Sequence, residues 1–379
     1  MAFTLTKEQE DFRSELRKFT EGQIRPRSKE WGEGGEKYPP ELVKLLKEKG
    51  LLKYFFPKEY GGFGLSSVNV CLIREELCRV NITAEALPVM QGLGSYPITL
   101  FGTEEQKMKY LTPLARGETF ISFCLTEPAA GSDVSGIETT AHLEGGYYIL
   151  NGVKTYVSHP DYSDFFIVFA KTAPELKSKG ISGFIIEKKF PGISFEKMRF
   201  IAPRPVAKMV LENCRVPKEN LLGPLNSGMK VAMSNLNVFR TTVGAASIGM
   251  AQGAFEEAVN FAKKRKAFGK NLVDFQVIQF KLADMATQLE AARLMVYKAA
   301  WLRDEGHEVV KEASMAKLFA TEAAQKIVDE AVQIFGGRGI WEDSRVAFLY
   351  KAVRLPRVYE GTSEIQRLVI ARQLLNKTS

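Results

Sequence analysis

Residues 147–158, YYILNGVKTYVS, decide the fold, because the hydrophobic period changes here from helical to extended. Tyrosine, isoleucine, valine and threonine stand on both sides of Asn151-Gly152, and such runs around an Asn-Gly pair are typical of a β-hairpin. We therefore predict two strands, 147–150 and 154–158, joined by a tight turn at Asn151-Gly152.

Further short strands are expected downstream of this segment. Residues 165–171, 183–187 and 208–211 are rich in valine, isoleucine and phenylalanine, which favour strands. A Pro191-Gly192 turn separates two of them. Short strands at this spacing predict a small antiparallel barrel or sandwich over residues 119–225.

The regions on both sides have helical periodicity. Near the N-terminus, Thr6 and Gln9 match a capping box. Further N-terminal helices are expected at 41–50, 68–79, 87–101 and from 103 onward. Near the C-terminus, apolar residues at helical spacing from Leu282 to Val296 lie on one face, and Gly306 is the expected C-cap. We predict a mostly α fold with a β insert: an N-terminal α-helical domain (1–118), a middle antiparallel β-domain (119–225) and a C-terminal four-helix bundle (226–379).

The composition is that of a soluble globular protein. The 379 residues are 45% hydrophobic and 25% charged, which excludes collagen-like and disordered proteins. The net charge is 52 − 44 = +8. A basic balance suits nucleic acid, an anionic membrane surface or an anionic small ligand, and it also suits a basic surface that binds nothing.

Four cysteines without a CxxC pair indicate buried free thiols in a reducing compartment. Three scattered histidines give no metal site. No apolar run reaches the length of a membrane span, and the charged N-terminus is not a signal peptide, so we expect a cytoplasmic protein.

Four local motifs are ambiguous when taken singly. The turn GSDVSG (131–136) could bind an anion through backbone N–H groups or be a surface turn. The cationic run 263–266 and the glycines 336–339 suit helix ends. Glu360 could be a solvated loop carboxylate.

Taken together and in order, the motifs resemble the acyl-CoA dehydrogenase family along essentially the whole chain. The matching blocks are FCLTEPAAGSDVSG (123–136), NGVKTYVSH (151–159), VPKENLLG (216–223), GMAQGAFEEAVNFAKKRKAFGK (249–270), FQVIQFKLADM (275–285), EAVQIFGGRG (330–339) and YEGTSEIQR (359–367). The resemblance implies three domains with FAD at their junction, and a homotetramer arranged as a dimer of dimers.

By this resemblance, Glu360 is the catalytic base. It would take the α-proton of an acyl-CoA thioester while hydride passes from the β-carbon to flavin N5. A carboxylate needs desolvation to be basic enough for this step. The resemblance also implies that the N–H of Glu360 and a flavin ribityl hydroxyl hold the thioester carbonyl. Some members carry the base near residue 239, where this chain has Phe239.

The same resemblance assigns cofactor contacts. Tyr156 and Ser158 stand where most members have Trp and Thr, and still offer an aromatic face and a hydroxyl. Arg265 and Phe268 would reach the neighbouring subunit's FAD, together with Gln276, Gln333 and Gly337. The remaining contacts are Phe123, Leu125, Thr126, Gly131 and Ser132, with Thr362 and Glu364 near the adenine.

The substrate-binding residues expected are Ser132, Arg240, Gly361 and Glu85. Glutaryl-CoA dehydrogenases have an Arg where this chain has Ala84, so we expect a short-chain, medium-chain or alicyclic acyl-CoA instead. Glu85 is either a solvated carboxylate at a helix start or a second carboxylate in the acyl cavity. In the cavity it would bind a polar or cationic acyl group, or act as a second acid/base.

Three functions remain open at this point. The first is a dehydrogenase that passes electrons to electron-transfer flavoprotein, the second an oxidase-like flavoenzyme that uses oxygen, and the third a non-catalytic acyl-CoA binder. The loop with Phe200, Ala202 and Arg204 departs from the family pattern near the acceptor face. The basic charge is compatible with the phosphates of FAD and CoA, and nothing in it calls for nucleic acid.

Overall fold

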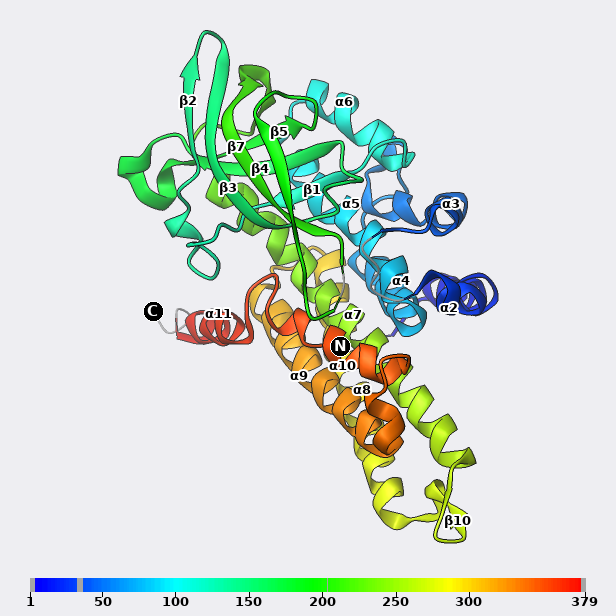
Figure 1. The fold of residues 1–379 in the computed structure, drawn as a ribbon. Helices are drawn as coiled ribbons and strands as arrows, with labels where there is room; N and C mark the ends of the chain where they lie inside the picture. Colours follow the sequence, from blue (N-terminus) through cyan, green and yellow to red (C-terminus); the bar gives the residue numbers. More distant parts are fainter. Residues whose placement is uncertain (1–3, 33–36, 203, 376–379) are drawn as a thin grey trace. The chain divides into compact units, whose positions relative to one another are not determined.

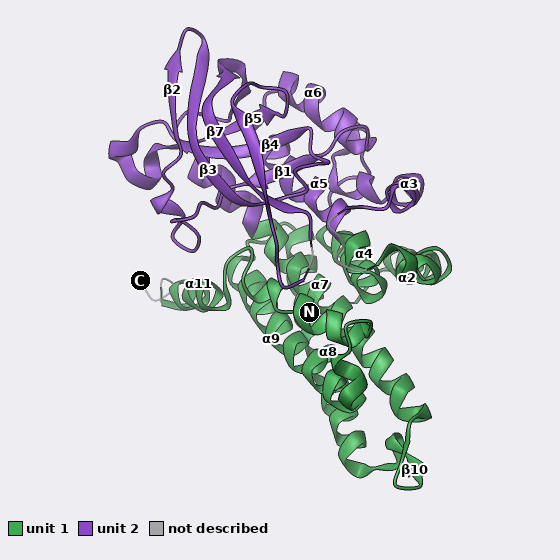
Figure 2. Ribbon diagram, viewed as in Figure 1, with its two compact units in different colours: residues 1–34, 66–85, 237–379 green, residues 35–65, 86–236 purple. Residues whose placement is uncertain are grey.

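The computed structural model describes residues 4–32, 37–202 and 204–375 (Figure 1). The chain forms two compact units, which Figure 2 colours separately. The first unit contains residues 1–34, 66–85 and 237–379, and the second contains residues 35–65 and 86–236. Helices α5 and α7 each contribute residues to both units.

An eight-stranded sheet is the centre of the second unit. Its strands are β1 (Ile121–Cys124), β2 (Thr140–Glu144), β3 (Tyr147–Ser158), β4 (Phe165–Lys171), β5 (Ile181–Glu187), β6 (Ile193–Met198), β7 (Val206–Pro217) and β8 (Leu221–Leu222). The order is β6-β7-β3-β2-β4-β5-β8, with β1 beside β4. The neighbours β1/β4 and β2/β4 are parallel, and the other pairs are antiparallel.

The predicted hairpin turn at Asn151-Gly152 is wrong. Residues 147–158 form one strand, β3, and the turn is at Gly145-Gly146, where both φ angles are positive (55° and 83°). Asn151-Gly152 is an irregularity in the pairing of β3 with β7. A Cβ at residue 152 would lie 2.4 Å from the Thr139 hydroxyl, so glycine is needed for close approach rather than for a turn.

The inward residues of the sheet form an apolar core. Leu150, Val157, Phe166, Val168 and Phe184 are all fully buried there. At the start of β3, the buried residues Tyr148 and Leu150 alternate with more exposed ones, as a strand with one buried face requires. The strands expected at 165–171, 183–187 and 208–211 are observed as β4, β5 and the centre of β7.

The remaining chain is mainly helical. The α-helices are α1 (Lys7–Phe19), α2 (Ser28–Trp31), α3 (Pro40–Glu48), α4 (Ser67–Val80), α5 (Ile82–Phe101), α6 (Glu104–Ala115), α7 (Gly228–Lys264), α8 (Gln276–Asp304), α9 (Val310–Phe335), α10 (Arg345–Ala352) and α11 (Ser363–Leu375), and a short hairpin, β9 (Lys266–Ala267) and β10 (Lys270–Asn271), precedes α8. Helix α5 begins five residues earlier than expected. The Asn81 side chain caps it by accepting a hydrogen bond from the Ala84 N–H (3.1 Å).

Small residues allow α7, α8 and α9 to pack closely in the first unit. A Cβ at Gly244 of α7 would lie 2.6 Å from Val296 of α8 and 3.4 Å from Ala320 of α9. A Cβ at Gly249 would lie 2.3 Å from the Glu75 carbonyl of α4. Any side chain at Gly249 would therefore force α4 and α7 apart.

The predicted fold class, helical with a middle β-sheet domain, is confirmed. The domain boundaries after residues 118 and 225 stay predictions. All four cysteines are free and buried. Among the described residues, no helix is both long and apolar enough to cross a bilayer.

Candidate active site

Glu360 lies in the short connection between the 3-10 turn Leu355–Arg357 and helix α11. Its φ is +53°, in the left-handed region that a residue with a Cβ rarely adopts. The next residue, Gly361, has φ +92°. The backbone at Glu360 is therefore strained and must be held by its surroundings.

Side chains from three helices hold the carbonyls of residues 359–361. The Lys317 ammonium on α9 donates to the carbonyl of Tyr359 (2.6 Å) and to that of Gly361. Arg240 Nε on α7 donates to the Glu360 carbonyl (3.3 Å). Gln366 on α11 donates to the Gly361 carbonyl (2.9 Å).

The Glu360 carboxylate is partly desolvated. Part of the residue remains accessible, but Oε2 is buried without a hydrogen-bond partner among the described residues. Burial raises the pKa of Glu360 above the 4.5 of an ordinary glutamate. The cations Arg74, Lys317 and Arg240 oppose this increase, and Glu85 adds to it.

Glu85 is not solvated, so the first of its two sequence interpretations is wrong. Its side chain is buried and pairs with Arg74, whose Nε lies 2.6 Å from Oε1. Arg74 also donates to the Thr242 hydroxyl (2.7 Å). Burial lowers the pKa of Arg74, but Glu85 and Glu360 more than compensate and raise it above its usual value. Arg74 therefore stays charged beside Glu85.

The structure thus gathers five charged side chains in the first unit, which we call the base cluster: Arg74, Glu85, Arg240, Lys317 and Glu360. The Glu360 N–H donates no hydrogen bond to any other residue that the structure describes. It remains available for an acceptor on a ligand. Phe239, at the alternative base position of the family, is fully buried and apolar.

In the second unit, the candidate flavin contacts lie on two adjacent segments. The Thr155 N–H donates to the Thr126 carbonyl (2.8 Å), so the end of β3 runs beside residues 125–127. The Tyr156 ring is 53% exposed. The hydroxyls of Thr126 and Ser158 make no side-chain hydrogen bond within the described residues. An exposed aromatic residue on segments that also carry two available hydroxyls suits a planar, hydrogen-bonding ring system such as flavin.

The glycine turn is open and well anchored. A Cβ at Gly131 would meet no atom within 4 Å, and Ser132 beside it is exposed. Glu127, just before the turn, accepts from the Thr139 N–H (3.1 Å) and pairs with Lys154 (2.6 Å). The turn therefore begins next to a buried, hydrogen-bonded ion pair and exposes its backbone N–H groups to solvent. Exposed N–H groups in a turn can bind an anionic group.

The residues expected to reach a neighbouring FAD are exposed in the first unit. Phe261 of α7 stacks on Phe335 of α9 (4.2 Å between centroids), which brings Arg265 and Gly337 to the same end of the bundle. Phe268 is 96% exposed and contacts Phe275 edge-on. Gln276, Gln333 and Glu364 are exposed as well, while Thr362 accepts from the Ile365 N–H at the start of α11.

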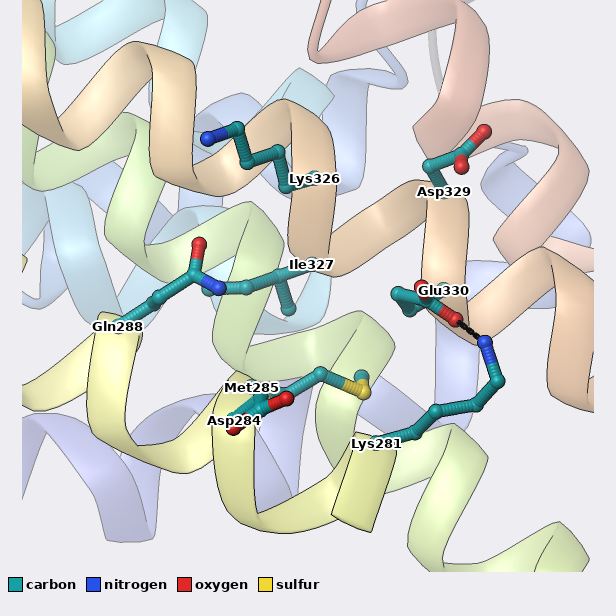
Figure 3. Close-up of a pocket in the computed structure, with 8 residues that line it drawn as sticks. All are labelled: Lys281, Asp284, Met285, Gln288, Lys326, Ile327, Asp329 and Glu330. Atoms are coloured by element: carbon teal, nitrogen blue, oxygen red, sulfur yellow. Dashed lines mark hydrogen bonds and ion pairs between the residues drawn. The ribbon is translucent and has the colours of Figure 1, made fainter. Parts of the chain in front are cut away.

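A separate small pocket of about 220 Å³ lies between α8 and α9 (Figure 3). Its lining is largely charged, and Lys281 forms an ion pair with Glu330 across it. None of its lining residues belongs to the candidate site, so it gives no information on the reaction.

Sequence reasoning missed two members of the base cluster, Arg74 and Lys317. Both lie on the buried face of a helix: Lys317 falls between Ala313 and Ala320, and Arg74 between Val70 and Leu77. The sequence does contain a signal for both residues, namely a single cation within an apolar stripe at helical spacing. Such a buried charge needs a buried partner, which marks the position as a candidate site.

Comparison with known proteins agrees with this geometry. Three family models match: "Acyl-CoA dehydrogenase, N-terminal domain" at 6–118, "middle domain" at 122–214 and "C-terminal domain" at 226–375. The chain is 45% identical to 3-(aryl)acrylate reductase of Clostridium sporogenes, over 98% of this chain and 99% of that protein. It is 43% identical to the caffeyl-CoA reductase-Etf complex subunit CarC of Acetobacterium woodii, over 91% and 92%.

Among solved structures, butyryl-CoA dehydrogenase from Megasphaera elsdenii matches with a TM-score of 0.93 and 37% identity, over 99% of this chain and 100% of that one. The similarity in sequence and in structure thus extends over nearly the full length of both chains. The chain therefore belongs to the acyl-CoA dehydrogenase family, and its cofactor is FAD.

Proposed function

We propose that the protein interconverts an acyl-CoA thioester and its α,β-unsaturated form, with Glu360 as the base. One observation carries the proposal: within the part of the chain that the structure describes, Glu360 has both a buried Oε2 without a partner and a backbone N–H without an acceptor. A thioester needs both, because its α-proton is acidic only when its carbonyl oxygen is held. Bound FAD supplies the acceptor for the hydride that leaves the β-carbon.

The residues of the chain would bind the thioester and take its α-proton. Glu360 takes the α-proton at Oε2, and its N–H donates to the thioester carbonyl. Arg74 and Lys317 stabilise the carboxylate before the proton arrives, since both lower its pKa. Arg240, Gly361, Ser132 and Glu85 stay proposed substrate contacts.

Short-chain, medium-chain and alicyclic acyl-CoAs are the substrates we propose, and glutaryl-CoA is not. Ala84 has no cationic side chain to bind a distal carboxylate, and the adjacent Glu85 is already neutralised by Arg74. The similarity to a butyryl-CoA dehydrogenase supports a short acyl chain. A cationic acyl group is disfavoured, because it would have to compete with the Arg74 guanidinium for Glu85.

Reduction of an aryl-substituted enoyl thioester is a second candidate. It is favoured by the 45% and 43% identity to an aryl acrylate reductase and a caffeyl-CoA reductase subunit. The same residues serve both directions, because Glu360 returns the proton to the α-carbon in the reverse reaction.

Electron-transfer flavoprotein is the proposed electron partner, and a homotetramer the proposed assembly. The CarC relative belongs to a complex with Etf, which supports the first proposal. The homotetramer is supported by apolar side chains near the end of the bundle that are at least 60% exposed. They are Val277, Phe280, Phe268, Ile340 and Trp341.

Anaerobic flavin absorbance with a panel of CoA thioesters tests the proposal and the role of Glu85. We expect a straight, branched or alicyclic short acyl-CoA to bleach the oxidised flavin, and glutaryl-CoA to leave it yellow. Glu85→Gln, which keeps the shape but removes the charge, should change the order of acyl preference while FAD stays bound. A panel in which no thioester bleaches the flavin would exclude the dehydrogenase.

The reverse direction is measured on the photoreduced enzyme. Reoxidation by an arylacrylyl-CoA that is faster than reoxidation by crotonyl-CoA would identify the reductase. Relative rates that are identical in wild type and Glu85→Gln would show that Glu85 does not contact the acyl group.

Arg265→Ala is expected to weaken FAD retention. Arg265 is exposed and directly follows the last residue of α7, Lys264. It lacks an ion-pair partner within the described residues. An anionic cofactor of a neighbouring subunit is therefore the ligand we expect for it. The FAD-to-protein ratio after gel filtration should fall, whereas Lys263→Ala in the same basic run should retain FAD. Full occupancy in Arg265→Ala would remove this contact from the proposed site.

A further inference from the structure

Lys317 is an unusual feature of the bundle, because its side chain is charged and only 1% exposed. It projects from the first half of α9, between turns that contain buried alanines. Its ammonium contacts no carboxylate within ion-pair distance among the described residues. It donates hydrogen bonds to two backbone carbonyls instead.

These two carbonyls, of Tyr359 and Gly361, flank Glu360 on both sides. One ammonium thus bridges the carbonyls of the two residues on either side of Glu360, whose own φ is +53°. A left-handed residue with a Cβ is strained and persists only where its surroundings fix it. Lys317 provides such a constraint, because its three donors can bind both carbonyls at once.

We propose that Lys317 is a positioning residue for Glu360: by holding the carbonyls of residues 359 and 361, it directs the Glu360 carboxylate and N–H toward one ligand. The inference rests on the proposed role of Glu360 as the base. It assigns to Lys317 no contact with the substrate and no proton transfer.

The electrostatics of the cluster agree with this geometry. Burial lowers the pKa of Lys317 to about 8, while the nearby Glu360 opposes this change and Arg240 adds to it. The charged groups around Glu360 come from four helices: Arg74 from α4, Glu85 from α5, Arg240 from α7 and Lys317 from α9. Loss of the ammonium would therefore raise the pKa of Glu360 further.

Lys317→Met tests the proposal in the FAD-loaded enzyme. We expect the rate constant of flavin reduction at saturating acyl-CoA to fall about 100-fold, the effect of a small misplacement of a reacting group. The acyl-CoA Kd and the FAD content should stay within about threefold of wild type, since Lys317 touches neither. The acid limb of the rate profile should move to higher pH.

Two further variants separate position from charge and from general damage. Lys317→Gln keeps a donor for one carbonyl and should recover part of the rate. Lys326→Met removes an exposed lysine of the same helix and should match wild type. A reduction rate of Lys317→Met within threefold of wild type, or an unshifted acid limb, would overturn the proposal.

A measurement of thermal stability keeps the inference testable if Lys317→Met folds poorly. Glycine at position 360 adopts φ +53° without strain, while glutamine keeps the strain and lacks the charge. Lys317→Met should therefore lower the Tm more in a Glu360→Gln background than in a Glu360→Gly background. Equal losses would show that Lys317 does not hold the strained residue. This result is independent of the flavin-bleaching assay that tests Glu360 itself.

Discussion

Replacement of Glu360 by glutamine is expected to abolish flavin reduction by acyl-CoA while FAD remains bound. Glutamine has the shape of glutamate but cannot accept the α-proton, and loss of a positioned base costs about 100- to 10,000-fold in rate. The measurement is anaerobic stopped-flow absorbance at the flavin band with saturating substrate. Reduction at more than a tenth of the wild-type rate would show that another residue is the base.

The pH dependence adds a second readout for Glu360. Burial raises its pKa, so the carboxylate is protonated and inactive at low pH, and the reduction rate should rise through a pKa above 4.5. Glu308→Gln, which removes an exposed carboxylate between α8 and α9, should keep both the rate and this profile. A wild-type profile with its acid limb at or below 4.5 would contradict the desolvated base.

Glu360→Gln should also stabilise the fold at neutral pH. The raised pKa means that the folded protein binds the Glu360 proton more tightly than the unfolded chain does. The contribution of Glu360 to stability is thus present at low pH and is lost as the pH rises through the folded-state pKa. A Tm of Glu360→Gln above that of wild type at pH 7, with a smaller difference at pH 4, is the expected result.

Lys154→Met is expected to be the most destabilising substitution in the β-sheet unit. Lys154 and Glu127 are 0% and 3% exposed, with Nζ and Oε1 2.6 Å apart. Burial raises the pKa of Glu127, but Lys154 and the Glu138 N–H outweigh it and the net pKa is lowered. Methionine would leave an unpaired buried carboxylate, which costs about 3–5 kcal/mol. Scanning calorimetry should give a Tm lower by roughly 6–20 °C.

An exposed ion pair in the same sheet is the matched control. Lys208 and Glu196 are 42% and 62% exposed and 3.3 Å apart. Such a pair contributes about 0–1 kcal/mol, so Lys208→Met should lower the Tm by no more than about 4 °C. Lys154→Met should also release FAD, because Glu127 anchors the turn with Gly131. Equal effects of the two substitutions would show that burial of the Lys154–Glu127 pair is unimportant.

Local sequence information predicted the elements of this fold well where the pattern was long. The strand at 165–171 matches β4 residue for residue, and the apolar stripe from Leu282 to Val296 lies in α8. Glycine at 306 has a φ of +84° just beyond the end of α8, as a C-cap requires. These features depend on neighbouring residues, so the sequence contains their cause.

The errors arose where a distant partner decides. The Asn151-Gly152 pair has the chemistry of a hairpin turn, but pairing of β3 with β7 on one side and contact with Thr139 on the other make it a bulge. The early start of α5 is a different kind of error, because its cap, Asn81, is a local signal that the sequence already contains. Turn propensity is a local preference of a few tenths to about 1 kcal/mol, and an extended sheet ladder outweighs it.

The sequence by itself determined the family, the helix–sheet–helix order and the position of Glu360 in its motif. Only the tertiary structure decided the state of that glutamate. The pKa of Glu360 and its left-handed backbone depend on contacts made by folding. The cations that act on its carboxylate are Arg74, Arg240 and Lys317, which lie 43 to 286 positions away along the chain. Desolvation and charge act through space and fall off over a few ångströms, so folding rather than the motif sets the chemistry of Glu360.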